Sequence, residues 1–204
     1  MADIASLADD IRPQVPLAVP EPTFTWAILQ AARMFCVESK VLRETAVYNV
    51  VANQRYYILE PVAADTEIFA VKAVQLGEFP LDPTAFEEIP QSSGDALAWI
   101  FEPPEDVWLT PTPTSDVTDG LAVRQILQPV EGATTLPDAL LRKYRDKITD
   151  GALSWIYNQD GMSWYNPNRA AAVMNTFERE IIKARHDADR TFRPRGFRTK
   201  PVEW

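Results

Sequence analysis

Apolar residues recur every three or four positions in a segment near the start of this chain. From about residue 23 to residue 40 they lie on one face of a helix: Phe24, Ala27, Ile28, Ala31 and Phe35. Thr23 is a suitable residue to cap the start of such a helix, because its side chain can accept from a free backbone N–H. The pattern therefore predicts one amphipathic helix here. The preceding residues 1–22 contain four prolines and are expected to form an arm.

Two further helical stripes follow near the other end of the chain. One is expected to be capped by Thr134 or Thr135 and to contain Pro137 in its first turn, and its apolar face includes Trp155, which is expected in the core between the last two helices. The other is expected to begin at Pro167, to be capped by Asn166, and to fade near residue 189. An isolated amphipathic helix is unstable, so the three stripes are expected to pack on one another.

Between the helices the pattern changes to short apolar and β-branched runs that are separated by turn residues. Six strands are predicted, over residues 46–51, 55–59, 67–76, 96–101, 107–109 and 121–127. The first two are expected to form a hairpin around the turn at Ala52, Asn53 and Gln54. Short strands with turns about every ten residues are typical of a β-sandwich.

The order of elements predicts an α+β fold in which a helical bundle carries an inserted antiparallel β-sandwich and an extended C-terminal tail. The expected parts are an arm over residues 1–22, a discontinuous helical domain over residues 23–43 and 133–189, a sandwich over residues 44–132 and a tail over residues 190–204. With 46% hydrophobic residues the chain can build a core. It has a single cysteine, which favours a reducing compartment.

Charge is distributed unevenly along the chain. Residues 1–136 contain seven Lys and Arg against 20 Asp and Glu, whereas residues 137–204 contain 13 against nine. The net charges of −13 and +4 agree with the total of −9. A chain that is acidic in front and basic behind can stack head to tail or dock on an acidic partner, although a solvated surface with a basic tail is an equal alternative.

The sequence offers little for catalysis, and no catalytic, cofactor or metal residue is predicted. One histidine, His186, and one cysteine, Cys36, are too few for the usual zinc sites. The phosphate-binding and nucleophile-elbow motifs are absent from the sequence. A hydrolase that uses the carboxylates of Glu102, Glu105 and Asp106 is a minor alternative, because solvated acids are the norm in turns.

Features that indicate association are clearer. Trp164 and Tyr165 stand in the loop before the last predicted helix and are candidate interface residues. The tail interleaves aromatic and basic residues, which suits anchors that fill pockets on a partner: Arg190, Phe192, Arg193, Arg195, Phe197, Arg198 and Trp204. The same composition could contact nucleic acid, but the total charge of −9 argues against a protein whose main role is gripping phosphates.

An ordered set of short motifs resembles the head-to-tail adaptor proteins of tailed bacteriophages, including the tail tubular protein A type. The similarity covers both helical ends, whereas the strand block matches in layout. The residues that carry it are Leu136-Pro137, Asp150-Gly151-Ala152-Leu153, Trp164-Tyr165-Asn166-Pro167, Phe177, Ala184-Arg185 and Arg195-Gly196-Phe197, together with a first helix similar to the opening of the family.

This resemblance implies a structural virion protein rather than an enzyme. The family forms rings, usually dodecamers, in the neck between the capsid portal and the tail nozzle or tail tube, and DNA passes through the lumen without specific binding. The resemblance implies that residues 190–204 dock on the portal protein, and it implies no cofactor and no membrane. The alternative is a β-sandwich module that binds a glycan or a protein, with Trp99 or Trp108 as the exposed aromatic residue.

Overall fold

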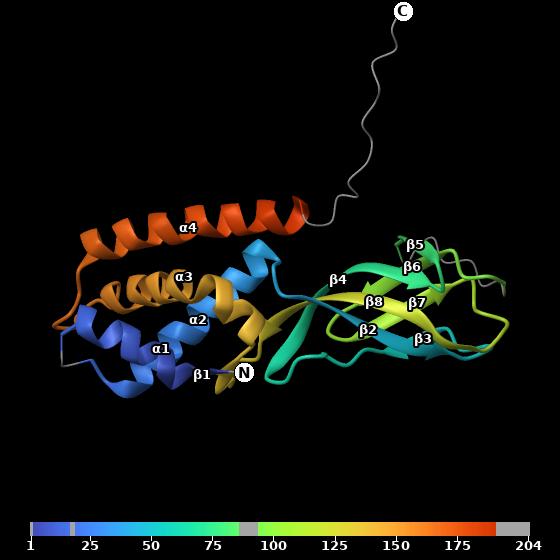
Figure 1. Cartoon of the computed structure of the whole chain (residues 1–204), viewed down its shortest axis with the longest axis horizontal. Coiled ribbons are helices and arrows are strands. Elements are labelled where there is room, and N and C mark those ends of the chain that lie inside the picture. Colours follow the sequence, from blue (N-terminus) through green and yellow to red (C-terminus); the bar gives the residue numbers. More distant parts are fainter. Residues whose placement is uncertain (1, 17–18, 86–93, 191–204) are drawn as a thin grey trace, which may run out of the picture.

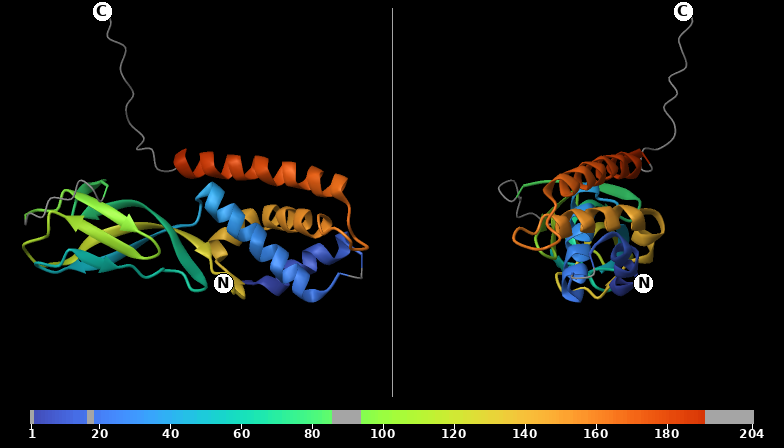
Figure 2. Two further views of the ribbon diagram at one scale, coloured as in Figure 1. Left: turned by 180° about the vertical axis from the view of Figure 1, so that it is seen from behind. Right: turned by 90° about the vertical axis from the view of Figure 1, so that its left-hand side faces the viewer.

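Helices gather at one end of an elongated molecule and strands at the other (Figure 1, with two further views in Figure 2). The computed structural model describes residues 2–16, 19–85 and 94–190. Four α-helices lie in these residues, and seven strands form one large sheet. The predicted α+β class is therefore confirmed.

Three helices follow the predicted stripes: α2 (Glu21–Ser39), α3 (Asp138–Tyr157) and α4 (Pro167–Arg190). As predicted, the side-chain oxygen of Asn166 caps α4 by accepting a hydrogen bond from the backbone N–H of Arg169 at 3.1 Å. The other predicted caps are wrong. Helix α2 begins before Thr23, because Pro22 is well suited to its first turn. Helix α3 is preceded directly by Pro137, beyond the two threonines.

A fourth helix, α1 (Ile4–Ile11), lies in the segment that was expected to form an arm. The Asp3 carboxylate caps it by accepting from the backbone N–H of Ala5 at 2.9 Å. The side chains of Ile4, Leu7 and Ile11 are buried against α2 and α3. Eight residues are too few for a helix that is stable alone, so this packing must hold it. Residues 2–16 are therefore part of the helical end, and a short 3₁₀ turn, η1 (Arg12–Gln14), ends the packed helix.

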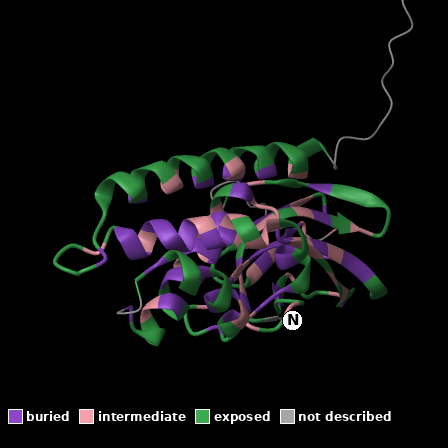
Figure 3. Cartoon of the chain, turned by 60° about the vertical axis from the view of Figure 1, so that its left-hand side comes forward, coloured by how far each residue is buried: buried purple, intermediate pink, exposed green. Residues whose placement is uncertain are grey.

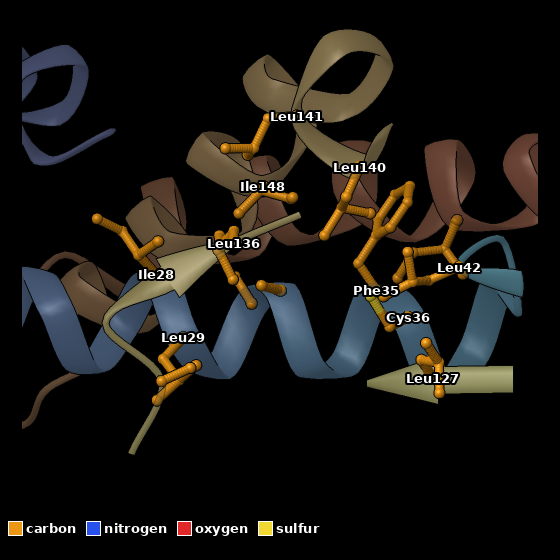
Figure 4. Packing of buried hydrophobic residues seen from close by; sticks show 14 of the residues in the cluster. Ile28, Leu29, Phe35, Cys36, Leu42, Leu127, Leu136, Leu140, Leu141 and Ile148 are labelled. Atoms are coloured by element: carbon orange, nitrogen blue, oxygen red, sulfur yellow. The ribbon is translucent and has the colours of Figure 1, made fainter. Parts of the chain in front are cut away.

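The helical core centres on α2, which contacts each of the other three helices. The Phe35 ring of α2 lies 4.8 Å from the Tyr144 ring of α3 and 5.9 Å from the Phe177 ring of α4, measured between centroids. Figure 4 shows Phe35 of α2 beside Leu140 of α3. Helix α4 covers this core with one side only, and Figure 3 shows exposed residues along its outer side.

The strands form a curled, mixed sheet rather than the expected antiparallel β-sandwich. Their order is β2-β8-β4-β5-β6-β7-β3. Their bounds are β2 Arg43–Val50, β3 Tyr56–Ile58, β4 Thr66–Leu76, β5 Phe79–Pro83, β6 Ala98–Glu102, β7 Asp106–Thr110 and β8 Val117–Pro129. Strands β5 and β6 run parallel, because the stretch between them supplies the connection of roughly a dozen residues that a parallel pair needs. Two short strands, β1 (Ala2–Asp3) and β9 (Thr135–Leu136), pair separately beside the helices.

The predicted hairpin of β2 and β3 is wrong. Asn53 does adopt a turn conformation with a φ of 63°, but β2 pairs with β8 and β3 pairs with β7. The two strands are thus opposite edges of the sheet, and side chains link them. The Tyr48 hydroxyl accepts from the backbone N–H of Glu60 at 3.0 Å, and the Gln125 amide donates to Tyr48 and to the Glu60 carbonyl. Distant pairing and burial therefore override the local turn signal.

Three ion pairs among the described residues hold the helical end against the sheet, and the longest joins Lys72 of β4 to Asp189 of α4 at 3.9 Å. The Arg43 guanidinium of β2 lies 3.1 Å from the Asp189 carboxylate of α4, and its side chain is only 4% exposed. Arg33 of α2 lies 3.1 Å from Glu67 of β4. The hydrogen bond from Arg43 holds the pKa of Asp189 below its ordinary value. The last turn of α4 is therefore fixed beside the sheet, directly before residue 191.

Candidate interaction surface

Arg190 is the predicted portal-docking residue that the structure describes. It is exposed and ends α4, in the turn that Asp189 ties to the sheet. The other six candidates of the tail lie outside the described residues: Phe192, Arg193, Arg195, Phe197, Arg198 and Trp204. Arg190 therefore lies at the junction between the helices and the sheet.

The two aromatic residues of the loop between α3 and α4 lie differently. Trp164 is buried, and its indole N–H donates to the Gln159 side-chain oxygen at 3.1 Å. Tyr165 is 42% exposed. The backbone N–H of Asn166 donates to the Tyr157 carbonyl at 2.8 Å, which returns the chain onto α3. Trp164 thus stabilises this loop from inside, and Tyr165 is the one of the pair that a partner can reach.

An apolar groove of about 220 Å³ lies beside this loop, between the end of α3 and the start of α4. Its walls are formed by uncharged side chains, namely Ser154, Trp155, Asn158, Pro167, Ala170, Ala171 and Met174. The Ser154 hydroxyl donates to the Gly151 carbonyl at 2.6 Å, so it does not project as a free polar group. A groove with such walls suits an apolar side chain.

Trp155 is only partly buried, so the prediction that it is a core residue between α3 and α4 is wrong in part. Its ring meets the ring of Trp26 of α2 edge to face, with centroids 5.6 Å apart, and Trp26 is 42% exposed. The Trp155 indole N–H is buried but has no hydrogen-bond acceptor in the described part of the chain. A buried donor without an acceptor is costly, and an incoming acceptor would remove that cost. Sequence reasoning missed this groove, because a helical stripe does not tell a core tryptophan from one at the rim.

The charge of the described chain is concentrated on the sheet. Residues 43–132 carry four Lys and Arg against 15 Asp and Glu, a net charge of −11, of which Glu87 and Glu88 lie outside the described residues. The sheet is therefore the acidic part of the molecule.

On the helices, burial raises the pKa of Asp150. Repulsion from Asp146 and Glu180 adds to this rise, and the nearby Lys147 opposes it.

The carboxylates weighed for a hydrolase lie on the hairpin between β6 and β7. Glu102 and Asp106 are cross-strand partners, and Glu105 is exposed at the turn between them. A hydrogen bond to Asp106 raises the pKa of the exposed Tyr56 phenol. Within the described ranges, no group of three or more His, Cys, Asp or Glu side chains is arranged to hold a metal ion.

The aromatic residues proposed for glycan binding are not both available. Trp99 is buried, and its indole N–H donates to the Leu81 carbonyl at 3.2 Å. Trp108 is partly buried and packs on Tyr56 with ring centroids 5.3 Å apart. Trp99 therefore cannot stack on a sugar in this conformation, which weakens the binding-module alternative.

The two residues with nucleophile or base chemistry also lie apart from the groove. Cys36 is fully buried in α2, and burial raises the pKa of its thiol to about 12. His186 is exposed on α4. Among the described helices, none is long and apolar enough to cross a membrane.

A packed helical end, an acidic curled sheet and an open apolar groove are features of a structural protein that works by association. Comparison with family models then gives its family: the chain belongs to the SU10 adaptor protein family, whose model matches residues 2–198. This makes it a phage adaptor, a structural virion protein of the neck from a family that is not known for enzymatic activity. Membership implies association with portal and tail components. A comparison with curated proteins found no match.

Proposed function

We propose that this chain forms a ring, most simply a dodecamer, between the portal and the tail nozzle or tail tube, and that DNA passes through its lumen. The observation that carries this proposal is the family match over residues 2–198, nearly the whole chain. The net charge of −11 on residues 43–132 supports it, because an acidic surface repels phosphates and lets DNA slide without binding.

Residues 190–204 dock on the portal in this proposal. The ion pair of Asp189 with Arg43 holds the preceding turn of α4 on the sheet, so the tail leaves the molecule from a fixed point. Arg190, Arg193, Arg195, Arg198 and Lys200 precede a single acid, Glu203. Such a segment fits a partner surface that offers acidic groups around pockets for Phe192 and Phe197.

Cryo-electron microscopy of virions tests the location, and binding of the purified chain to its portal tests the tail. A ring of this chain between portal and tail is the expected image, and its absence from the neck would refute the proposal. Phe197→Ala should weaken portal binding by at least about tenfold without changing the melting temperature. Ile182→Ala, at an exposed position of α4, serves as the control and should bind like the wild type.

A further inference from the structure

Phe79 is the most exposed large apolar side chain among the described residues, at 75%. It begins β5 directly after the turn that contains Gly77, whose positive φ of 59° closes the hairpin between β4 and β5. Nothing in the described residues covers this ring, although Leu76 pairs with it across the strands. A phenyl ring held out on a rigid hairpin is poor solvated surface and suits an anchor for another molecule.

The groove beside Trp155 has the shape and chemistry that would receive such a ring. Cavities of about 150 Å³ with apolar walls bind benzene, so a groove of about 220 Å³ admits a phenyl group. Its flexible wall, Met174, can adapt to an aromatic edge.

The charges at the two places are complementary. Phe79 stands among exposed carboxylates. Glu78 precedes it, and Asp82 lies further along β5. Asp119 lies in the neighbouring turn, which is joined to this hairpin by the hydrogen bond from the Gly77 N–H to the Gly120 carbonyl. The groove is lined without any acid, and it opens at the start of α4, the positive end of a 24-residue helix. The acidic rim around Phe79 therefore meets no acid in the lining of the groove.

A molecule cannot fill its own groove with its own Phe79. Figure 1 places β5 at the sheet end and the start of α4 at the opposite end of the molecule. Helix α4 runs from the groove toward the sheet over 24 residues, or about 36 Å at 1.5 Å per residue. A contact between Phe79 and this groove must therefore join two copies of the chain, and a contact between two different surfaces of identical chains is the kind that closes rings.

We infer that neighbouring copies of this chain contact one another head to tail, with Phe79 of one copy in the Trp155 groove of the next. This inference specifies the subunit contact of the proposed ring and rests on that proposal for its biological setting. It accounts for the Phe79 ring, which nothing in the described residues covers. The tail of the chain and a portal segment are the competing occupants of the groove.

Cross-linking in purified virions and in the purified full-length chain tests the contact. Phe79→Cys and Ala171→Cys are introduced together, and a short bismaleimide is added. Cys36 does not interfere, because it is fully buried and its thiol has a pKa of about 12. A ladder of covalent multimers of this chain is expected. The matched control combines Ala171→Cys with Ile58→Cys, which is 55% exposed on β3, and should give no ladder.

Each other outcome would overturn the inference. An absence of multimers in both preparations would exclude the contact, and dimers of the Phe79→Cys single variant would indicate a symmetric contact instead. Cross-links from Ala171→Cys to another protein would show that this protein, rather than Phe79 of a second copy, occupies the groove. The proposed function is judged separately from the image of the neck: a ring without the ladder refutes only the contact, and a ladder without the ring refutes only the function.

A second variant tests the energetic weight of the same contact. Phe79→Asp should weaken self-association of the full-length chain by at least about tenfold, because it places a carboxylate opposite an apolar groove. The melting temperature should not change, since the side chain is 75% exposed. Ile58→Asp should leave self-association unchanged. Equal effects of the two variants would show that general surface charge, rather than the groove, controls association.

Discussion

Gly151→Ala tests a close contact between α2, α3 and α4. Gly151 lies in α3 where α2 and α4 both approach it, and an added Cβ would stand 2.7 Å from Cε2 of Phe177 and 2.9 Å from Cβ of Ala31. Real Cβ atoms essentially never come that close, so side chains or helices must shift. Phe177 is fully buried against Phe35, and Ala31 has no rotamer to change.

Two opposing terms determine the size of the effect. Alanine gains about 1 kcal/mol over glycine in helix propensity, whereas forcing an extra methyl group into a packed core costs about 1–3 kcal/mol. Two clashes with rigid neighbours put Gly151→Ala near the upper limit of that cost. The free energy of unfolding should therefore fall by about 1–2 kcal/mol, or about 2–8 °C in melting temperature for a chain of this size.

Urea denaturation of the full-length chain measures this change, and a second substitution locates its cause. Phe177→Leu alone should destabilise, but in the double variant the smaller side chain should leave room for the new methyl group, so the two losses should not add. Gly132→Ala is the control, because no atom lies within 4 Å of its added Cβ. A Gly151→Ala variant as stable as the wild type, or strict additivity with Phe177→Leu, would refute the close packing of α2, α3 and α4.

Four further predictions follow from single side chains. Ile11→Ala should lower the free energy of unfolding by about 2–5 kcal/mol, because Ile11 is fully buried, and an unchanged urea midpoint would exclude α1 from the core. Asp65→Asn should destabilise at pH 7, because the carboxylate accepts from the N–H and hydroxyl of Thr135, which lowers the Asp65 pKa. That contribution is present above the ordinary value of 3.8 and is lost as pH falls through the lowered pKa, so a gap that persists in acid would contradict it. Cys36 should resist alkylation at pH 8 until the protein is denatured, and fast labelling of the native chain would contradict its burial. Trp155→Phe should cost less than about 1 kcal/mol in the isolated chain, since the indole N–H has no acceptor in the described residues; a larger loss in denaturation would indicate a missed partner.

Local patterns predict the elements whose formation depends on local interactions. The stripes of α2, α3 and α4 are long enough for their apolar faces to be seen in the sequence, and Asn166 with Pro167 marks the start of α4 by its own chemistry. A local pattern does not predict helix α1, because this helix has only eight residues and its stability depends on partners distant in sequence. Strand β5 is not predicted for another reason. Pro80 and Pro83 suggest a turn, yet both lie in a strand whose pairing is short.

Aromatic residues near a loop show why surface sites are hard to predict from sequence. Trp164 and Tyr165 are neighbours with similar composition around them, but one is buried and bonded to Gln159 while the other is exposed. The deciding factor is where the return of the chain onto α3 directs each side chain, and that depends on the packing of two helices. The groove at Trp155 has the same origin, because it exists only between the surfaces of α3 and α4.

The order of the strands depends on contacts that no local signal records. The turn at Asn53 favours a hairpin of β2 with β3, but β2 pairs with β8 and β3 pairs with β7. In the observed order β2 lies next to the long strand β8. Gln125 of β8 is fully buried and donates toward both sheet edges through Tyr48 and Glu60. Because these edges meet through side chains, the curl closes without a continuous ladder of backbone hydrogen bonds between β2 and β3. The hairpin of β4 and β5 takes no part in that closure, which leaves Phe79 projecting and gives a second copy of the chain a rigid feature to bind.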